Sequence, residues 1–508
     1  MRERSLRLIA EIPKTAKRPI IMEAVRAVLI STYEMGRQPF GLASPAAWLR
    51  REGHSVTCVD LSRSPLPRAA VEQAELIAFF LPMHTATRLF LRAGAKIRAL
   101  NPHAHLCGYG LYAPLNEAAL REAGVGTILG GEFEQGLVDL ARRLAAHELA
   151  RPSGGPARVH VGQTLSSVNP KAAHALAYPS GGPARPADAP LISLARQQFI
   201  TPDRAGLPPL AAYAQLVVNG TSHCTTRRVG YTEASRGCKH LCRHCPVVPV
   251  YRGIFRIVQR DVVLEDIRQQ VAAGAEHITF GDPDFLNGPG HAMPIVEALH
   301  REWPELTYDV TVKVEHILNH RDLLPQLKRT GCAFVTSAVE SLDDAVLEKL
   351  AKGHTRAGFI EALQLMRASE LPMSPTFLPF TPWTTLSGYR EFLRELVALG
   401  LAGQVAPVQL AIRLLIPEGS LLLELPDVRA ILEPFDTAGL CYPWKNADPA
   451  VDELCRSIHA AIQRADKRRA GREEIFREIW DLAGAGRWLD APMASRATIP
   501  YLTEPWYC

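Results

Sequence analysis

The chain has 508 residues, of which 47% are hydrophobic and 21% are charged, and its formal net charge is +5. This length predicts two or three domains, each able to bury its own core. The small net charge indicates neither a nucleic-acid partner nor a membrane surface. No apolar run approaches the roughly 18 residues of a membrane-spanning helix, and residues 1–24 lack the apolar core of a secretory signal. We therefore expect a cytoplasmic protein without a membrane partner.

Residues 25–148 alternate between apolar strand candidates and helical stretches, after an N-terminal extension at 1–24. We expect strands at 25–31, 55–61, 75–81, 105–109 and 126–129, and helices at 42–52, 87–100 and 132–146. Such alternation predicts a doubly wound parallel sheet of the Rossmann type. Ligands of these sheets sit beyond the carboxyl ends of the strands.

Residues 149–190 are rich in Pro, Gly, Ala and Ser, and the heptapeptide PSGGPAR occurs twice, at 152–158 and 179–185. A segment of this composition buries too little apolar surface to fold alone. We predict a flexible linker between two domains.

A second alternation follows at 191–416 and predicts a second α/β domain. We expect strands at 229–235, 277–281, 308–314, 334–339, 374–380 and 406–412, with helices between them. Six strands, each feeding a helix, predict a partial (βα)6 barrel of the TIM type with its functional edge at the strand carboxyl ends. Residues 417–508 predict a helical C-terminal region.

The stretch SRGCKHLCRHCP places three thiols just past the first strand of this barrel, at Cys238, Cys242 and Cys245. Ten cysteines in a large chain without a secretory signal favour reduced thiols over disulfides. Iron–sulfur clusters are held by thiolates, and a four-iron cluster normally takes four. Three thiolates leave one iron open to another ligand. Zinc is the rival, but it needs four ligands, and here only His240 or His244 offers the fourth.

The Cys-x3-Cys-x2-Cys spacing resembles the motif of the radical SAM superfamily, and the resemblance covers residues 228–415. It implies a [4Fe–4S] cluster whose open iron chelates S-adenosylmethionine, and an injected electron that cleaves the sulfonium to give a carbon radical. It also implies S-adenosylmethionine contacts from Gly281, Asp282, Glu340 and Arg413.

Two of these contacts have a structural alternative. Asp282 before Pro283 also suits an Asx turn, and Arg413 also suits a surface salt bridge. The residue before the third cysteine is usually aromatic in the family and here is His244.

The N-terminal sheet joined to such a barrel resembles the cobalamin-binding radical SAM proteins. Gly130 and Gly131 match the pair of glycines that is usual in those proteins. Glycines there would let the backbone approach the edge of a corrin. The Asp-x-His-x-x-Gly signature that supplies a histidine to cobalt is absent. The resemblance therefore implies either cobalamin bound without a histidine ligand or a sheet that only packs.

The ending IPYLTEPWYC, with Cys508 last, resembles the CUAEP/CCAEP-tail radical SAM proteins, in which a cysteine is followed by selenocysteine or cysteine. The resemblance implies a chain cut short at a selenocysteine codon and a catalytic, thiophilic role for Cys508. The alternative is a frayed terminus with an idle thiol.

Together these resemblances imply an enzyme that cleaves S-adenosylmethionine reductively and alkylates a small substrate or forms a carbon–heteroatom bond on it. The implied partners are that substrate and an electron donor such as flavodoxin or ferredoxin. Three alternatives stay open: transfer of a carbon fragment such as 3-amino-3-carboxypropyl to a trivalent metalloid, an iron–sulfur redox or metalloid sensor, and tRNA modification. The last ranks low because residues 417–508 carry mixed charge rather than a basic patch.

Overall fold

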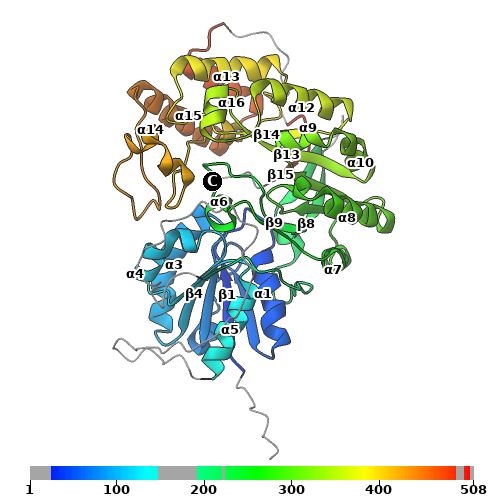
Figure 1. The fold of residues 1–508 in the computed structure, drawn as a ribbon, viewed down its shortest axis with the longest axis vertical. Helices are drawn as coiled ribbons and strands as arrows, with labels where there is room; N and C mark the ends of the chain where they lie inside the picture. The colour runs from blue at the N-terminus through cyan, green and yellow to red at the C-terminus, as the bar shows by residue number, and fades with distance from the viewer. Residues whose placement is uncertain (1–23, 147–190, 220–223, 488–496, 504–508) are drawn as a thin grey trace, which may run out of the picture.

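A computed structural model describes residues 24–146, 191–219, 224–487 and 497–503. Two α/β units follow one another along the long axis of the molecule, with the short helix α6 (Val247–Tyr251) between them (Figure 1). Among the described residues, no helix combines the length and the apolarity needed to cross a bilayer.

The N-terminal unit is a parallel sheet with helices on both faces, as the alternation predicts. Its strand order is β2-β1-β3-β4-β5-β6. Helices α1 and α5 pack on one face, and α2, α3 and α4 on the other. The bounds are β1 Arg26–Ser31, α1 Phe40–Arg51, β2 Ser55–Asp60, α2 Arg68–Gln73, β3 Leu76–Phe80, α3 His84–Leu100, β4 His105–Tyr109, α4 Glu117–Glu122, β5 Thr127–Gly131 and α5 Glu134–Ala145.

The sixth strand of this sheet comes from the far side of the predicted linker. β6 (Leu191–Ser193) pairs in parallel with β5, with Gly131 opposite Ser193. Gly131 has φ +69°, and a Cβ there would overlap the carbonyl oxygen of Ser193. Glycine is therefore required for this pairing. The predicted linker itself lies outside the described residues, and the proposed domain limits stay a prediction.

The second unit is a curled sheet of strand order β14-β13-β12-β11-β8-β7-β15, in which β8 and β11 to β14 run parallel. This half-barrel confirms the predicted fold class. Its strands are β7 Gln215–Asn219, β8 Cys224–Thr232, β11 His277–Phe280, β12 Thr307–Thr311, β13 Cys332–Glu340, β14 Met373–Phe377 and β15 Tyr501–Leu502. Its helices are α7 Arg260–Ala272, α8 Pro289–Glu302, α9 Val314–Asn319, α10 Leu324–Arg329, α11 Asp344–Lys349, α12 Arg356–Ala368 and α13 Leu386–Ala398.

The sixth barrel strand predicted at 406–412 is wrong. Pro407–Leu410 forms a 3-10 turn, and only an isolated bridge between Phe380 and Arg413 continues the sheet. Proline has no N–H for a ladder. The side-chain oxygen of Gln409 instead accepts a hydrogen bond from the N–H of Phe377, at 3.1 Å.

The region after the barrel is helical, as predicted. α15 (Pro449–Arg468) and α16 (Arg472–Ala483) pack on the barrel core, and the short α14 (Pro426–Arg429) lies in a separate cluster with Trp444. A further two-stranded antiparallel ribbon, β9 (Ser235–Gly237) with β10 (Phe255–Ile257), brackets the thiol-bearing loop and α6.

Candidate functional site

A cavity of about 780 Å³ lies where the carboxyl edges of both sheets meet. The N-terminal sheet contributes Leu111 and Phe133, the barrel contributes Tyr231 and Asp282, and α15 contributes Asp466. Most of the surface that lines this cavity is apolar. A site of this size, walled on several sides by different elements, suits a cofactor together with a small substrate.

The thiol loop, residues 238–245, follows β9 and precedes α6. Gly237, the last residue of β9, leads into it with φ +75°, and a Cβ there would overlap the carbonyl oxygen of Ile254. Within the loop, the N–H of Cys245 donates to the carbonyl of Cys242, at 3.1 Å. Gly237, just before the loop, and Val247, two residues after Cys245, line the cavity.

The three thiols of this loop act on one another. Burial raises the pKa of Cys245 to about 12, and the neighbouring Cys242 and Cys238 contribute to that rise. Burial is also the main cause of the raised pKa of Cys238. Free thiolates are therefore unfavourable here, and a metal centre that accepts them removes this cost. No disulfide joins the cysteines of the described residues.

The histidines that were candidates for a fourth zinc ligand have other contacts. Nε2 of His240 lies 3.2 Å from Nε2 of His316, and Nε2 of His244 lies 3.1 Å from the carboxylate of Glu340. The donor set is thus three soft thiolates in one loop, which fits a [4Fe–4S] cluster better than tetrahedral zinc.

Asp282 and Gly281 line the cavity at the end of β11. The carboxylate of Asp282 accepts hydrogen bonds from the N–H of Ala234, at 2.9 Å, and the hydroxyl of Ser235, at 2.5 Å. Burial raises the pKa of Asp282 to about 7. A Cβ at Gly281 would overlap the hydroxyl of Tyr231. Asp282 thus joins β11 to the segment that leads into the thiol loop.

Glu340, at the end of β13, is brought next to the thiol loop. One oxygen accepts from Nε2 of His244 at 3.1 Å and from Nζ of Lys352 at 3.3 Å. Burial would raise the pKa of Glu340, but Lys352 and His244 hold it at about 2. Glu340 is therefore ionised, and its backbone is left-handed at φ +69°.

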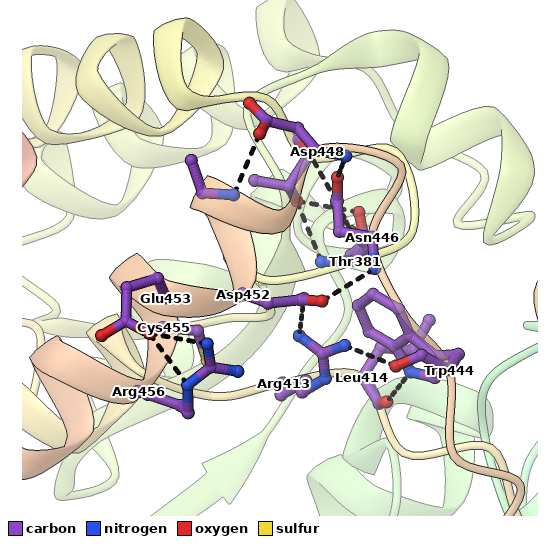
Figure 2. A network of polar contacts seen from close by, with 12 residues as sticks. Thr381, Arg413, Leu414, Trp444, Asn446, Asp448, Asp452, Glu453, Cys455 and Arg456 are labelled. Atoms are coloured by element: carbon purple, nitrogen blue, oxygen red, sulfur yellow. Dashed lines mark hydrogen bonds and ion pairs between the residues drawn. The ribbon is translucent and has the colours of Figure 1, made fainter.

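Arg413 lies in a polar network between the barrel and α15 (Figure 2). Its guanidinium donates to Asp452 at 2.7 Å and to the carbonyl of Trp444 at 2.7 Å, and it lies 3.5 Å from the centre of the Trp444 ring. Arg413 is not among the described residues that line the cavity. A contact of Arg413 with S-adenosylmethionine stays a prediction, because its guanidinium already donates to Asp452 and Trp444.

The remaining predicted residues belong to the N-terminal sheet and the tail. A Cβ at Gly130 would meet Pro114 at 2.8 Å, and Gly131 lines the cavity. Nε2 of His84 lies 2.5 Å from the carbonyl oxygen of Gly439, so this ring nitrogen already has a hydrogen-bond partner. Cys508 lies outside the described residues.

A buried ion network that joins the two units was not predicted from the sequence. Arg236, next to the thiol loop, pairs with Glu134 at 2.7 Å, Glu233 at 2.6 Å and Glu132 at 3.2 Å. Two of its partners lie about a hundred positions away, and local patterns carry no information on such contacts.

Residues 232–395 match the family model of the radical SAM superfamily. Hopanoid C-3 methylase of Methylococcus capsulatus is 24% identical over 151 residues, which are 30% of this chain and 29% of that protein. Ribosomal protein uS12 methylthiotransferase RimO of Parabacteroides distasonis is 24% identical over 202 residues, 36% of this chain and 44% of that protein. The chain thus spans less than half the length of these relatives.

Two solved structures share the fold over most of the chain. The cobalamin-dependent S-adenosylmethionine radical enzyme OxsB, with aqua-cobalamin bound, has a TM-score of 0.63 at 14% identity and covers 87% of this chain and 67% of its own. The radical S-adenosylmethionine methyltransferase TsrM of Kitasatospora setae has a TM-score of 0.52 at 16% identity, covering 74% and 70%. Residues 232–395, which include the three thiols, are thus similar to the radical SAM enzymes, a superfamily whose cofactors are a [4Fe–4S] cluster and S-adenosylmethionine. The two solved structures show a likeness of fold alone.

Proposed function

We propose that this protein is a radical SAM enzyme that alkylates a small substrate held in the cavity between the two sheets. The observation that carries the proposal is the position of the thiol loop. Residues that flank Cys238 and Cys245 line the same cavity as the carboxyl edge of the N-terminal sheet. Chemistry at the loop and a ligand on the N-terminal sheet would therefore share one cavity.

Cys238, Cys242 and Cys245 would hold the cluster, and Gly281 and Asp282 would border S-adenosylmethionine. When bound, these cofactors supply an electron and a carbon radical. The residues of the chain would position these cofactors. Hydrogen bonds from Ser235 and Ala234 hold the carboxylate of Asp282, and Glu340 holds the ring of His244 inside the thiol loop. The largely apolar cavity wall would keep water from the reacting atoms. A flavodoxin-like or ferredoxin-like protein would donate the electron.

Cobalamin is the third cofactor that we propose, at the carboxyl edge of the N-terminal sheet. The cavity wall there is mainly apolar and includes Phe80, Pro82, Met83 and Leu111. Such a wall fits a flat, largely apolar macrocycle, and the fold likeness to OxsB and TsrM supports this placement. Nε2 of His84 already contacts the carbonyl of Gly439, so we propose that cobalamin binds here without a histidine ligand to cobalt from that strand end.

The other functions considered from the sequence gain no specific support from the geometry of the described residues. Transfer of a carbon fragment to a metalloid and the truncation at a selenocysteine codon both depend on Cys508, outside the described residues. They stay predictions.

Reductive cleavage of S-adenosylmethionine is the test. Protein purified and reconstituted without oxygen, then reduced with dithionite, should release 5′-deoxyadenosine or another cleavage product, measured by mass spectrometry. The Cys242→Ala variant should lose cluster absorbance and product together. Cys332→Ala is the matched control. Cys332 is also buried, but it begins β13, whereas Glu340 beside the thiol loop ends that strand. A stable cluster with no cleavage product would favour a sensor and contradict the proposal.

A further inference from the structure

A group of metal-ligand side chains lies beside the thiol loop but outside the cavity lining. His240 comes from the loop itself, Asp284 from the turn after β11, and His316 from α9 after β12. One ligand atom from each lies within 4.8 Å of the others. None of the three is among the described residues that line the cavity. The proposed function therefore leaves this group without a role.

The three side chains are close enough to share one ion. Oδ2 of Asp284 lies 2.7 Å from Nδ1 of His316 and 3.7 Å from Nε2 of His240, and Nε2 of His316 lies 3.2 Å from Nε2 of His240. A ring can offer only one of its nitrogens to an ion, and with one atom from each residue the set lies within 4.8 Å. Ligands at about 2.0–2.2 Å from a common metal are separated by up to about 4.4 Å, so the set needs only a small adjustment to bind one ion.

Asp284 is fully buried, and its two oxygens have different partners. Oδ1 accepts the N–H of Leu286, at 3.3 Å. Oδ2 makes no hydrogen bond of acceptable geometry, and neither does Nδ1 of His316, although the two atoms are close. Orphaned polar atoms at such depth are costly. An ion bound by them would remove that cost.

His240 is oriented for this role by a second carboxylate. Its Nδ1 lies 3.5 Å from Oε2 of Glu315, and that oxygen also accepts from Nζ of Lys313, at 3.4 Å. A carboxylate near one ring nitrogen favours the tautomer with the proton on that nitrogen and leaves the other nitrogen, here Nε2, available to a metal. Glu315 also offsets the positive charge of Lys313, which would otherwise oppose a cation beside His240.

We propose that His240, Asp284 and His316 bind one divalent first-row transition ion, for which two imidazoles and a carboxylate are a suitable ligand set. The ion joins the thiol loop to the turns after β11 and β12. It therefore fixes His240, which lies two residues from Cys238 and two from Cys242. Binding of this ion does not depend on the reaction proposed above.

Uptake of Co²⁺ and Zn²⁺ by the full-length chain tests the site. The parent protein carries Cys238→Ala, Cys242→Ala and Cys245→Ala, so that no thiol of the loop can take the ion. It should bind one equivalent, with a Co²⁺ absorption spectrum that lacks sulfur charge transfer. Asp284→Asn and His316→Gln should each lower the affinity for the ion by at least ~10–100-fold, which is the loss seen when a hydrogen-bond partner of a metal ligand is removed. Glu315→Gln, which removes such a partner, should lower the affinity by an amount within that range. His320→Gln, whose ring centre is 5.7 Å from that of His316, should change nothing.

A second measurement uses the anaerobically reconstituted chain with all thiols present. After dialysis against one equivalent of zinc, elemental analysis should find zinc in addition to the cluster iron, and Asp284→Asn should lower the zinc content alone. Absence of saturable uptake in both proteins, or equal uptake by Asp284→Asn and the parent, overturns the proposal. In that case the group is a hydrogen-bonded pair of histidines beside a carboxylate.

Discussion

Glu340 shows how a single carboxylate ties the thiol loop to the barrel wall. It is buried with Lys352, and Lys352 and His244 hold the pKa of Glu340 at about 2, below its ordinary 4.5. A depressed pKa contributes stability that is present above the ordinary value and is lost as the pH falls through the lower one. The contribution of Glu340 should therefore be complete at pH 7 and fade between pH 4.5 and 2.

Removing the cation of this pair should be costly. Lys352→Met leaves an ionised carboxylate buried without its main partner, and we expect a loss of about 3–5 kcal/mol in the free energy of unfolding. Urea titration of the reconstituted protein measures it. Lys349→Met is the control, because Lys349 pairs with Asp427 at the surface and should contribute below about 1 kcal/mol. If the two substitutions lower the free energy of unfolding equally, the buried Lys352–Glu340 pair stabilises the fold no more than a surface pair does.

Gly281 is a position where a single methyl group matters. In Gly281→Ala, the new Cβ would overlap the hydroxyl of Tyr231, and both residues line the cavity. Overpacking of this kind costs about 1–3 kcal/mol, and we also expect weaker binding of S-adenosylmethionine in isothermal titration calorimetry. Gly290→Ala, in open space near the start of α8, should instead be neutral or gain up to about 1 kcal/mol. Unchanged affinity in Gly281→Ala would place the ligand away from this strand end.

At the scale of elements, the missing sixth strand has a testable substitute. The side-chain oxygen of Gln409 accepts from the N–H of Phe377, where a ladder carbonyl would otherwise stand. Gln409→Leu leaves that buried donor unpaired and should cost about 1–3 kcal/mol, with faster hydrogen exchange at the amide of Phe377. Gln404→Leu is the matched control, because the side-chain oxygen of Gln404 has no hydrogen-bond partner. Slow exchange in Gln409→Leu would show that another group serves the Phe377 amide.

Elements with a strong local pattern could be predicted from the sequence. Leu76–Phe80 is an unbroken apolar run, buried at every position, and this is typical of a central parallel strand. The three thiols were found from spacing alone, because all the ligands lie within one loop. Segments whose pairing depends on distant partners were not found. β6 has only three residues, β15 only two, and neither is amphipathic over a useful length.

The same reason explains what was missed in the site. His240 could be singled out beside the thiols, but Asp284 and His316 reach it only because β11 and β12 are neighbours in the sheet. Arg413 was placed at a rim by assuming a sixth strand. The 3-10 turn at Pro407–Leu410 replaces that strand, and Asp452 of α15 takes up the guanidinium.

At the scale of the whole molecule, the two units meet through a buried excess of negative charge. Three carboxylates, from Glu132, Glu134 and Glu233, surround the one guanidinium of Arg236. Burial is the main cause that raises the pKa of Glu132 to about 7, and Glu134 and Glu233 act in the same direction against the pull of Arg236. Near neutral pH the interface can therefore hold one proton that the unfolded chain would release.

This proton makes the stability of the assembled chain depend on pH. A raised carboxyl pKa means that the folded state binds the proton more tightly, so stability falls as the pH rises from 4.5 through about 7. Each pH unit between the unfolded and the folded pKa is worth about 1.4 kcal/mol, so Glu132 alone accounts for a decline on the order of 3 kcal/mol across that window. Thermal or urea unfolding between pH 5 and 8 measures it.

Glu132→Gln should reduce this slope, because the amide does not ionise. Its oxygen can accept from Arg236, and its NH2 group can donate to the hydroxyl oxygen of Tyr251. The variant should be as stable as the wild type near pH 5 and more stable at pH 8, where the wild type has lost the proton. Glu276→Gln, at an exposed ion pair with Arg228, should leave the slope unchanged. If Glu132→Gln is instead destabilised equally at both pH values, the carboxylate is ionised throughout, and Arg236 alone balances the charge between the two units.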